Sequence, residues 1–459
     1  MTEDQFYIRK KEAPLLPPPN NQVGVLGWFW RNGLSSMANF SSFGYACRSI
    51  FMIIVTFVIL YIGLNGLWSL INFAFIDAIW TDADEQKRLA CATTLQGGQL
   101  PENWFGACWP FIYAKAKLLI YGRYDSSELW RVNIIYLLLV VGTVWVMLPR
   151  LPYRFFVGLF MLLVFPILAF VLLTGGGLRA SPNFYLILFV ACAFSLVLGY
   201  CHDRRILGNV PPFLGNIIIF GRIFLSYLTL VVIVFSIDFG LKTVSTTDWG
   251  GLLVTLVVAI TGIVASLPLG ILLALGRRSN MPIIRILCVI FIEFWRGVPL
   301  ITVLFMASVM LPLFLPEGTD FNKLLRALIG VTLFSAAYMA EVVRGGLQAI
   351  PKGQFEGASA LGLSYLQSTR LIILPQALVM VIPGIVNTFI GLFKDTTLVL
   401  IISLFDLLGI VQATFADPEW STPVQSLTGY FAVAAIFWVI LFTMSRYSMF
   451  MENKLRRNR

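Results

Sequence analysis

Long runs of apolar residues, separated by short polar and basic segments, dominate this sequence of 459 residues. A helix needs roughly 20 mostly apolar residues to cross about 30 Å of hydrocarbon, because each residue adds about 1.5 Å. Segments of this length recur along the chain and predict about ten membrane-spanning helices. The predicted spans are Ile50–Ile71, Val132–Leu148, Phe155–Leu173, Phe184–Tyr200, Ile217–Ile237, Gly251–Leu275, Ile283–Phe314, Leu325–Val343, Gln376–Ser403 and Leu427–Ser445.

One predicted span departs from a simple helix. The apolar stretch Ile283–Phe314 is longer than a bilayer requires, and Pro299 lies inside it. Proline lacks the backbone N–H that a helix interior needs, so we expect a kink or a break near Arg296–Pro299. The fold class predicted by the whole pattern is all-α, a polytopic helical membrane protein.

Composition argues against a soluble protein with a very large core. Only 12% of the residues are charged and 58% are hydrophobic, whereas soluble domains carry about 25% charged residues. The formal net charge of +10 could indicate nucleic-acid binding. In a membrane protein it more often reflects Lys and Arg retained on cytoplasmic loops beside anionic lipid.

The basic residues also predict the orientation. When the N-terminus is placed in the cytoplasm, most Lys and Arg residues fall on the cytoplasmic side, including those of the basic tail 447–459. Both termini are therefore expected in the cytoplasm. The N-terminal segment 1–49 holds Trp28, Phe29 and Trp30 and fits an interfacial segment, while a disordered arm is the alternative.

The long external loop, 72–131, contains Cys91 and Cys108. If this loop faces an oxidising periplasm, the two cysteines could form a disulfide. Their spacing alone does not show that they meet.

The connection between the eighth and ninth predicted spans, 344–375, is unusually long and partly apolar for a cytoplasmic loop. Pro351 interrupts it, and helix-forming residues lie on either side of Gly362. We expect a short helix on the membrane surface and a backbone turn at Gly362. The side chains expected to be available to a partner are Leu361, Leu363, Tyr365 and Leu366. An interfacial helix without a partner is the alternative.

This connection carries a specific pattern, Glu356-Gly357-Ala358, then Gly362, and nine residues later Ile372, Leu374 and Pro375. It resembles the EAA signature of binding-protein-dependent ABC importer permeases. The one departure is Gly357, where the pattern has an alanine; glycine lowers helix propensity by about 1 kcal/mol. The resemblance implies that this helix couples the permease to an ATPase subunit. The residues expected to do so are Glu356, Gly357, Ala358, Leu361, Gly362 and Leu363.

Further stretches are similar to the polar amino acid uptake permeases, and this similarity covers about Trp249 to Arg446. The stretches concerned are Trp249–Leu256, Glu293–Leu300, Ser335–Gly346 and Lys394–Leu398. The layout of the N-terminal half resembles the permease subunits of general L-amino acid transporters. The implied domains are an accessory membrane region of about five spans at 50–248 and a type I ABC importer permease core at 249–446.

The resemblance implies partners as well as a fold. A bacterial inner-membrane permease of this kind works with a second permease subunit, an ATPase dimer and a periplasmic amino-acid-binding protein. The second permease would be a homologous chain or a copy of this one. ATP and Mg²⁺ would be bound by the ATPase, because this sequence has no Gly-x-x-x-x-Gly-Lys-Ser/Thr loop to hold phosphates.

Charged residues inside the predicted spans are the candidates for a substrate pathway, because charge is costly in a bilayer. An amino acid needs a cation at its carboxylate end and an anion at its ammonium end. Arg296 or Lys394 could fill the first role, and Glu341 or Asp395 the second. Aromatic walls and nearby hydroxyls complete the predicted set with Trp295, Phe334, Tyr338, Thr396 and Thr397.

These charges have an alternative role in holding helices together. Glu293 lies three residues before Arg296, and Glu341 three before Arg344, so each pair can neutralise itself on one helix face. Lys394 and Asp395 are adjacent and cannot share a face, so we expect an unwound stretch there.

The remaining chemistry is sparse. His202 is the only histidine, and no Cys/His cluster has the spacing of a zinc site, so we expect neither a metal site nor an enzyme. A secondary amino acid carrier is one alternative function, but it would need internal repeats, and the two halves of this chain show no convincing repeat. A regulatory membrane subunit is the other alternative.

Overall fold

A computed structural model describes residues 43–81, 87–177, 182–204, 206, 212–314 and 322–457. The predicted interfacial segment 1–49 lies mostly outside these residues, as do short parts of the loop 72–131 and of the tail. Within the described residues every regular element is a helix, and the only other pairings are isolated β-bridges. The all-α fold class is confirmed.

The chain divides into two compact units, and each is described by itself. The first unit comprises Met1–Ile79 and Pro101–Ala107, and the second comprises Trp80–Leu100 and Cys108–Arg459. The domain boundary predicted near residue 248 was drawn from the family resemblance and not from contacts within the fold, and it stays a prediction.

The first unit contains one long apolar helix, α2 (Phe43–Ile71), which continues into a π-helical turn, η4 (Asn72–Ile76). The segment 101–107 is fastened to the end of this helix. The backbone N–H of Ala107 donates to the carbonyl oxygen of Phe73 at 2.8 Å. The indole N–H of Trp104 donates to the carbonyl oxygen of Asp77, also at 2.8 Å.

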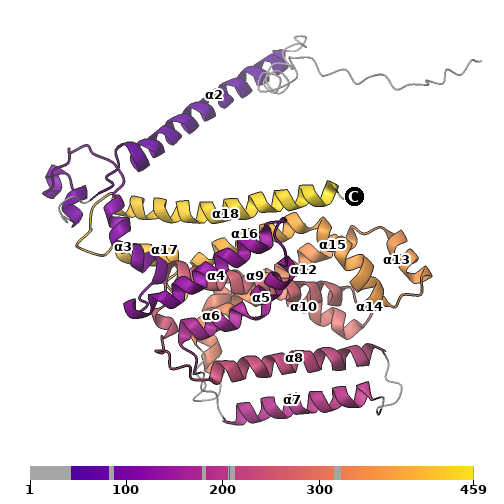
Figure 1. Ribbon diagram of the computed structural model, residues 1–459. Coiled ribbons are helices and arrows are strands. Elements are labelled where there is room, and N and C mark those ends of the chain that lie inside the picture. Colours follow the sequence, from indigo (N-terminus) through magenta and orange to yellow (C-terminus); the bar gives the residue numbers. More distant parts are fainter. Residues whose placement is uncertain are drawn as a thin grey trace, which may run out of the picture. The chain divides into compact units, whose positions relative to one another are not determined.

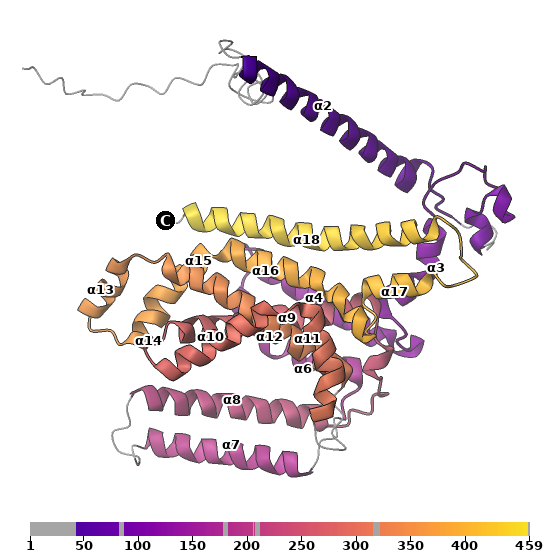
Figure 2. The ribbon, with the colours of Figure 1, turned by 180° about the vertical axis from the view of Figure 1, so that it is seen from behind.

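The second unit begins with the accessory helices α3–α8 and continues with the core helices α9–α18 (Figures 1 and 2). The accessory helices are α3 (Trp109–Tyr121), α4 (Leu129–Met147), α5 (Arg154–Leu163), α6 (Phe165–Thr174), α7 (Pro182–Asp203) and α8 (Pro212–Ser236). The core helices are α9 (Gly251–Arg277), α10 (Pro282–Gly297), α11 (Leu300–Phe305), α12 (Lys323–Gln348), α13 (Lys352–Ala360), α14 (Tyr365–Ser368), α15 (Leu374–Met380), α16 (Ile382–Asp395), α17 (Leu407–Thr414) and α18 (Gln425–Arg457).

The predicted spans agree with these helices. Eight helices of the described residues are long and apolar enough to cross a membrane, or up to ten when each of two bent pairs counts as one span. The expected break near Arg296–Pro299 is confirmed, because α10 and α11 meet there at 102°. A second bend was not predicted. Helices α5 and α6 meet at 42°, where Pro166 occupies the first turn of α6.

Two helices lie in segments that the hydropathy pattern assigned to loops. Helix α3 lies inside the predicted external loop 72–131, and α17 follows the ninth predicted span. Both are shorter than a bilayer requires, so a search for long apolar runs does not find them. In both views α3 and α17 lie at one end of the second unit (Figures 1 and 2). Helices α13 and α14 and the end of α18 lie at the opposite end.

The accessory helices share a hydrophobic cluster with the core. Val132 of α4 and Phe165 of α6 belong to the same buried cluster as Leu253 and Val254 of α9. Helices α9 and α12 pack against each other along the centre of the core. Helices α7 and α8 form an adjacent pair further out, which contacts α6 through α8 (Figures 1 and 2). Burial of apolar side chains therefore fixes α4 and α6 on the core helices.

A set of paired charged residues, called the clasp below, strengthens the attachment of α4 to the core at the end of the second unit that carries α3. The guanidinium of Arg131, only 1% exposed as a residue, lies 2.7 Å from the carboxylate of Glu128 and donates to the carbonyl oxygen of Lys242 at 2.8 Å. The ammonium of Lys242 in turn pairs with Asp125. This hydrogen-bonded ammonium lowers the pKa of the Asp125 carboxyl to about 2. The clasp joins the start of α4 to the segment that leads into α9.

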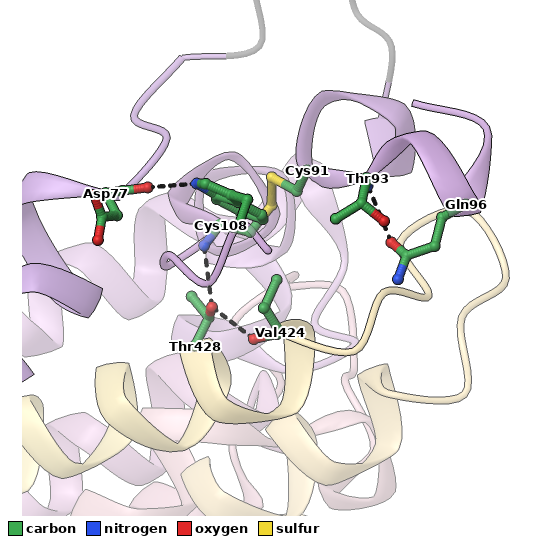
Figure 3. The surroundings of a disulfide bond; sticks show 8 residues. Asp77, Cys91, Thr93, Gln96, Cys108, Val424 and Thr428 are labelled. Carbon is green, nitrogen blue, oxygen red and sulfur yellow. Dashed lines mark hydrogen bonds between the residues drawn. A yellow bond between two sulfur atoms is a disulfide. The ribbon is translucent and has the colours of Figure 1, made fainter. Parts of the chain in front are cut away.

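Cys91 and Cys108 form a disulfide in the segment before α3 (Figure 3). Their Cα atoms are 5.8 Å apart, and both residues are only 1% exposed. The backbone N–H of Cys108 donates to the hydroxyl of Thr428 in α18 at 3.0 Å. The disulfide therefore ties the segment that contains Cys91 to the start of α3, and the hydrogen bond holds that start beside the start of α18.

Replacing both Cys91 and Cys108 with serine is expected to destabilise this segment by about 3 kcal/mol, the value for a closed loop of 17 residues. Thermal unfolding of the purified protein, with and without a thiol reductant, measures the effect. Cys288→Ser is the control, because Cys288 is a free cysteine. A melting temperature of the native protein that does not respond to reductant would contradict the prediction.

A close backbone contact joins α3 to the start of α9. Gly251 has φ +61°, and a Cβ built on it would lie 2.0 Å from the carbonyl oxygen of Leu119 in α3. Its N–H donates to the carbonyl oxygen of Phe405 at 2.9 Å. Only glycine has both the backbone freedom and the small size that this contact requires.

Gly251→Ala is expected to lower the free energy of unfolding by about 2–4 kcal/mol, because it adds left-handed strain to a steric clash with backbone. Gly391→Ala in α16 is a suitable control, since its Cβ would meet nothing within 4 Å. Thermal unfolding of both variants in the same nanodiscs measures the difference. Equal melting temperatures for the two variants would show that the α3–α9 contact can relax without cost.

Candidate functional site

The cytoplasmic connection predicted at 344–375 folds into two short helices, α13 and α14. Helix α13 packs inward through Phe355, which contacts the buried cluster that α9 and α12 share, and through Ala358, which is buried. The guanidinium of Arg278, at the end of α9, lies over the Phe355 ring at 5.5 Å. It also donates to the carbonyl oxygen of Leu347 in α12 at 2.8 Å. Helix α13 is therefore attached to the ends of both central helices.

The turn expected at Gly362 is present. Gly362 has φ +70° and follows α13 as the left-handed residue of a Schellman motif. The N–H of Leu363 donates to the carbonyl of Ala358 at 3.2 Å, and that of Gly362 donates to the carbonyl of Ser359 at 3.0 Å. Helix α14 begins three residues later, at Tyr365, and the hydroxyl of its N-cap Ser364 accepts the Gln367 N–H in a capping box.

The outer surface of this connection is apolar and unusually exposed. Leu361 is 77% exposed, Tyr365 65% and Leu366 48%. Glu356 is exposed beside them, and within the described residues it has no ion-pair partner. Gly357 is also exposed, and a Cβ there would meet nothing within 4 Å. We call the exposed residues Glu356, Gly357, Leu361, Tyr365 and Leu366 the α13–α14 surface.

Elsewhere in the core, the carboxylate of Glu341 forms ion pairs with arginines from three helices. Glu341 of α12 lies 2.8 Å from Arg277 of α9, 2.6 Å from Arg344 of α12 and 3.6 Å from Arg296 of α10. Its side chain is 16% exposed. Arg277 also lies 2.9 Å from Glu293. We call these five residues the Glu341 cluster; it contains three cations and two anions and holds α9, α10 and α12 together.

The pairing within this cluster differs in part from the sequence prediction. The expected contact of Glu341 with Arg344 is present. Glu293 and Arg296 do not pair with each other as predicted: Glu293 pairs with Arg277 of α9, and Arg296 with Glu341 of α12. The reason is tertiary, because the helix packing places carboxylate and guanidinium groups from different helices within reach.

Several predicted pathway residues do meet beside this cluster. The Arg296 guanidinium lies over the Tyr338 ring at 5.9 Å, and the Tyr338 and Phe334 rings are 4.9 Å apart. Trp295 lies next to Arg296 but packs against the apolar cluster of the accessory and core helices. Glu341, Arg296, Tyr338 and Phe334 thus form one group on α10 and α12.

The other predicted pathway residues lie around the end of α16, and two of them line a pocket. Lys394 and Thr397 line a cavity of about 680 Å³ with side chains of α17 and α18, among them Leu408, Tyr430 and Trp438. No residue of the Glu341 cluster lines this cavity. The structure therefore separates the predicted pathway residues into two groups.

The backbone around Lys394 and Asp395 changes type without unwinding. Helix α16 ends at Asp395 and continues as a 3₁₀-helix, η12 (Thr396–Ile402). The hydroxyls of Thr396 and Thr397 donate to the carbonyl oxygens of Phe393 and Lys394, respectively, at 2.8 and 2.9 Å. In the described residues, neither the Lys394 nor the Asp395 side chain has a hydrogen bond or ion pair.

Two residues of importance were missed from the sequence, Arg277 and Arg278. They look like ordinary basic residues at the cytoplasmic end of a span, and they served only to predict orientation. In the structure, Arg277 joins the Glu341 cluster and Arg278 contacts α13. Their adjacency at the end of an apolar helix was the available signal. No group of three potential metal-ligating residues occurs in the part of the chain that the structure describes.

Comparisons with known proteins identify the family. Residues 266–457 match the family described as "Binding-protein-dependent transport system inner membrane component". The chain is 39% identical over 446 residues to the "Inner membrane amino-acid ABC transporter permease protein YhdY" of Escherichia coli, covering 97% of each protein. It is 38% identical over 468 residues to the "Glutamate/glutamine/aspartate/asparagine transport system permease protein BztC" of Rhodobacter capsulatus, covering 99% of each.

Among solved structures, the chain is similar to one described as "Crystal structure of an amino acid ABC transporter with histidines". The sequence identity is 28% and the TM-score 0.40, and the match covers 44% of this chain and 92% of the other. The two relatives above, by contrast, extend through the accessory helices as well as the core. The chain belongs to the family of binding-protein-dependent transport system inner membrane components.

Proposed function

We propose that this chain is the transmembrane permease subunit of an ATP-driven importer that moves L-amino acids from the periplasm to the cytoplasm. The near full-length similarity to two amino-acid permeases supports this substrate class. The observation that carries the proposal is the α13–α14 surface. Exposed leucine and tyrosine side chains beside an unpaired glutamate fit a protein partner better than water.

The proposed partner at this surface is an ATPase subunit that binds ATP and Mg²⁺. This chain has no phosphate-binding loop of its own, so the energy has to come from another protein. The coupling residues are Glu356, Gly357, Ala358, Leu361, Gly362 and Leu363. Closure of an ATPase dimer would move α13, and through Phe355 and Arg278 it would move the ends of α9 and α12.

The proposed orientation follows from the same arrangement. The α13–α14 surface and the end of α18 lie at one end of the second unit, and the disulfide-bearing segment lies at the other (Figures 1 and 2). An ATPase requires the first end to be cytoplasmic. A disulfide is stable in the oxidising periplasm at the second. A periplasmic amino-acid-binding protein would deliver substrate there, and a second permease, homologous or identical, would complete the pathway.

Within the membrane, we propose Lys394 as the group that receives the substrate carboxylate, with Asp395 as the candidate for the ammonium group. The carboxylate of Glu341 is already surrounded by three guanidinium groups and is poorly placed to take a further cation. Within the described residues Lys394 has no ion-pair partner, and it lines an open pocket whose volume of about 680 Å³ falls in the range of about 300–1,000 Å³ for small-molecule sites. Arg296, Tyr338, Phe334 and Trp295 remain positioning candidates on the cytoplasmic side.

Lys394→Gln is expected to reduce amino acid uptake at least tenfold, because it removes the unpaired cation and leaves the neighbouring packing intact. Initial uptake rates in proteoliposomes, measured over a range of substrate concentrations, test this. Lys394→Arg is the matched control and should retain most of the activity. If Lys394→Gln transports at the native rate, Lys394 has no part in the pathway.

The proposed function is tested by reconstituting the chain with its ATPase, partner permease and amino-acid-binding protein in proteoliposomes. Uptake of labelled L-glutamate, L-glutamine and L-histidine is measured with ATP, without ATP and with an imposed ion gradient. We expect uptake only with ATP and binding protein. Uptake driven by the gradient alone would identify a secondary carrier, and an assembled complex that carries none of the amino acids would overturn the proposal.

A further inference from the structure

A small cleft opens at the end of the second unit opposite the α13–α14 surface. It has a volume of about 360 Å³ and lies between the accessory helix α3 and the core helix α17. Lys115 and Arg123 line it from the accessory side, and Phe405, Ile410 and Asp417 line it from the core side. The cleft therefore exists only because the accessory helices are attached to the core.

The charges of this cleft are unbalanced. Asp417 pairs with the ammonium of Lys115 through one carboxylate oxygen, and its other oxygen accepts the backbone N–H of Glu419 at 2.9 Å. Both oxygens of the carboxylate are thus in use. Arg123 is exposed, and in the described part of the chain it has no ion-pair partner. The cleft presents one uncompensated positive charge.

Arg123 is also held in position. The residue before it, Gly122, has φ +69° and forms an antiparallel bridge with Trp249 at the start of the core. The Arg123 guanidinium lies over the Phe405 ring at 5.8 Å. A guanidinium that stacks on an aromatic ring keeps its N–H donors free at the edge for a carboxylate. Less side-chain entropy is therefore lost when an anion binds.

The charges and the size of the cleft favour a larger partner over a free amino acid. A site for a free amino acid has to satisfy the ammonium group, and the carboxylate in this cleft, Asp417, already pairs with the ammonium of Lys115, which neutralises its charge. The cleft is also small, because its volume of about 360 Å³ lies near the lower limit of the range of about 300–1,000 Å³ for small-molecule sites. An acidic side chain that projects from a protein needs only the cation and the aromatic wall.

We infer that the α3–α17 cleft is a docking point for an acidic side chain of the periplasmic amino-acid-binding protein, with Arg123 as its ion-pair partner. This inference rests on the proposed function, which places the cleft on the periplasmic side. It assigns a role to the accessory region that the core alone cannot supply, since α3 lies outside the residues matched to the family, 266–457. The accessory helix α3 then forms one side of the surface to which the amino-acid-binding protein docks.

The test measures binding of the fluorescently labelled amino-acid-binding protein to the full transporter complex in nanodiscs. Arg123→Glu is expected to raise the dissociation constant at least tenfold at low salt, mainly through slower association. Raising the salt concentration should weaken binding to the native complex, so that its dissociation constant approaches that of the Arg123→Glu complex. Lys117→Glu is the matched control, because Lys117 is an exposed cation on the same helix that lies outside the cleft and contacts Ser126. Arg123→Lys keeps the charge but loses the stacked guanidinium, so it should weaken binding by less than Arg123→Glu does.

Each outcome of this test is informative. Equal effects of Arg123→Glu and Lys117→Glu would reduce the result to general electrostatics and overturn the inference. Competition by free L-glutamate for Arg123, detected with a binding protein kept saturated with substrate, would assign the cleft to a free carboxylate and also overturn it. If the native complex binds the protein and transports, yet Arg123→Glu changes nothing, only this inference fails. If the native complex does not bind the protein at all, the proposed function fails.

Discussion

Glu341→Ala is expected to destabilise the protein by about 2–3 kcal/mol and to abolish most ATP-driven uptake. The change leaves Arg277, Arg296 and Arg344 close together without the carboxylate that they share. Breaking a buried ion pair costs about 3–5 kcal/mol. The three guanidinium side chains are 24–36% exposed, so water screens part of their repulsion and the expected cost is lower. Thermal unfolding in nanodiscs measures the loss of stability, and proteoliposome uptake measures the loss of transport.

A second substitution separates repulsion from substrate binding. The double variant Glu341→Ala/Arg277→Ala removes one of the stranded cations, so it should recover part of the lost stability. A residue that bound the substrate ammonium would show the opposite pattern. In that case Glu341→Ala would leave the melting temperature unchanged and alter the choice among amino acids, and the Arg277 change would rescue nothing.

Adjacent arginines connect this cluster physically to α13, the proposed coupling helix. Arg277 contacts Glu341, and the next residue, Arg278, contacts both Phe355 of α13 and the backbone of α12. A displacement of α13 therefore acts on the same end of α9 that carries the Glu341 cluster. This contiguous set of contacts links the α13–α14 surface to α10, where the bend of 102° begins.

The sequence predicted the spans well because a bilayer imposes a strong and local constraint. Ten apolar segments were expected, and the helices found match them, including the break before Pro299. The misses were the bend at Pro166 and the helices α3 and α17. Their formation depends on tertiary contacts such as the α3–α9 approach at Gly251 and not on hydropathy.

The site was only partly predictable for a related reason. The Gly362 turn follows from local backbone chemistry, and the sequence indicated it. The partners of Glu293 and Arg296 depend on the crossing of α9, α10 and α12, which no spacing along one helix encodes. The separation of Lys394 from Glu341 likewise comes from packing. Local patterns identified the charged residues, and the fold decided which of them meet.

Glu356→Lys is expected to abolish ATP-driven uptake by weakening ATPase binding about 100-fold, while insertion and stability stay unchanged. Glu356 lies exposed on α13 and has no ion-pair partner within the described residues, so its replacement removes no internal contact. A charge reversal at a docked surface commonly costs 2–5 kcal/mol, and about 2.7 kcal/mol corresponds to 100-fold. Co-purification of the ATPase with the detergent-solubilised chain measures the loss.

The neighbouring residue offers a matched control. Gly357→Ala supplies the alanine that the family pattern has at this position, and its Cβ would meet nothing within 4 Å. It should stabilise α13 by about 1 kcal/mol and leave ATPase binding at the native level or above. If Glu356→Lys retained the ATPase as well as Gly357→Ala does, docking would not pass through this face of α13. In that case the contacts of Phe355 and Arg278 with α9 and α12 would only hold α13 in place. A displacement of α13 can reach the Glu341 cluster only if a partner first binds the outer surface of α13.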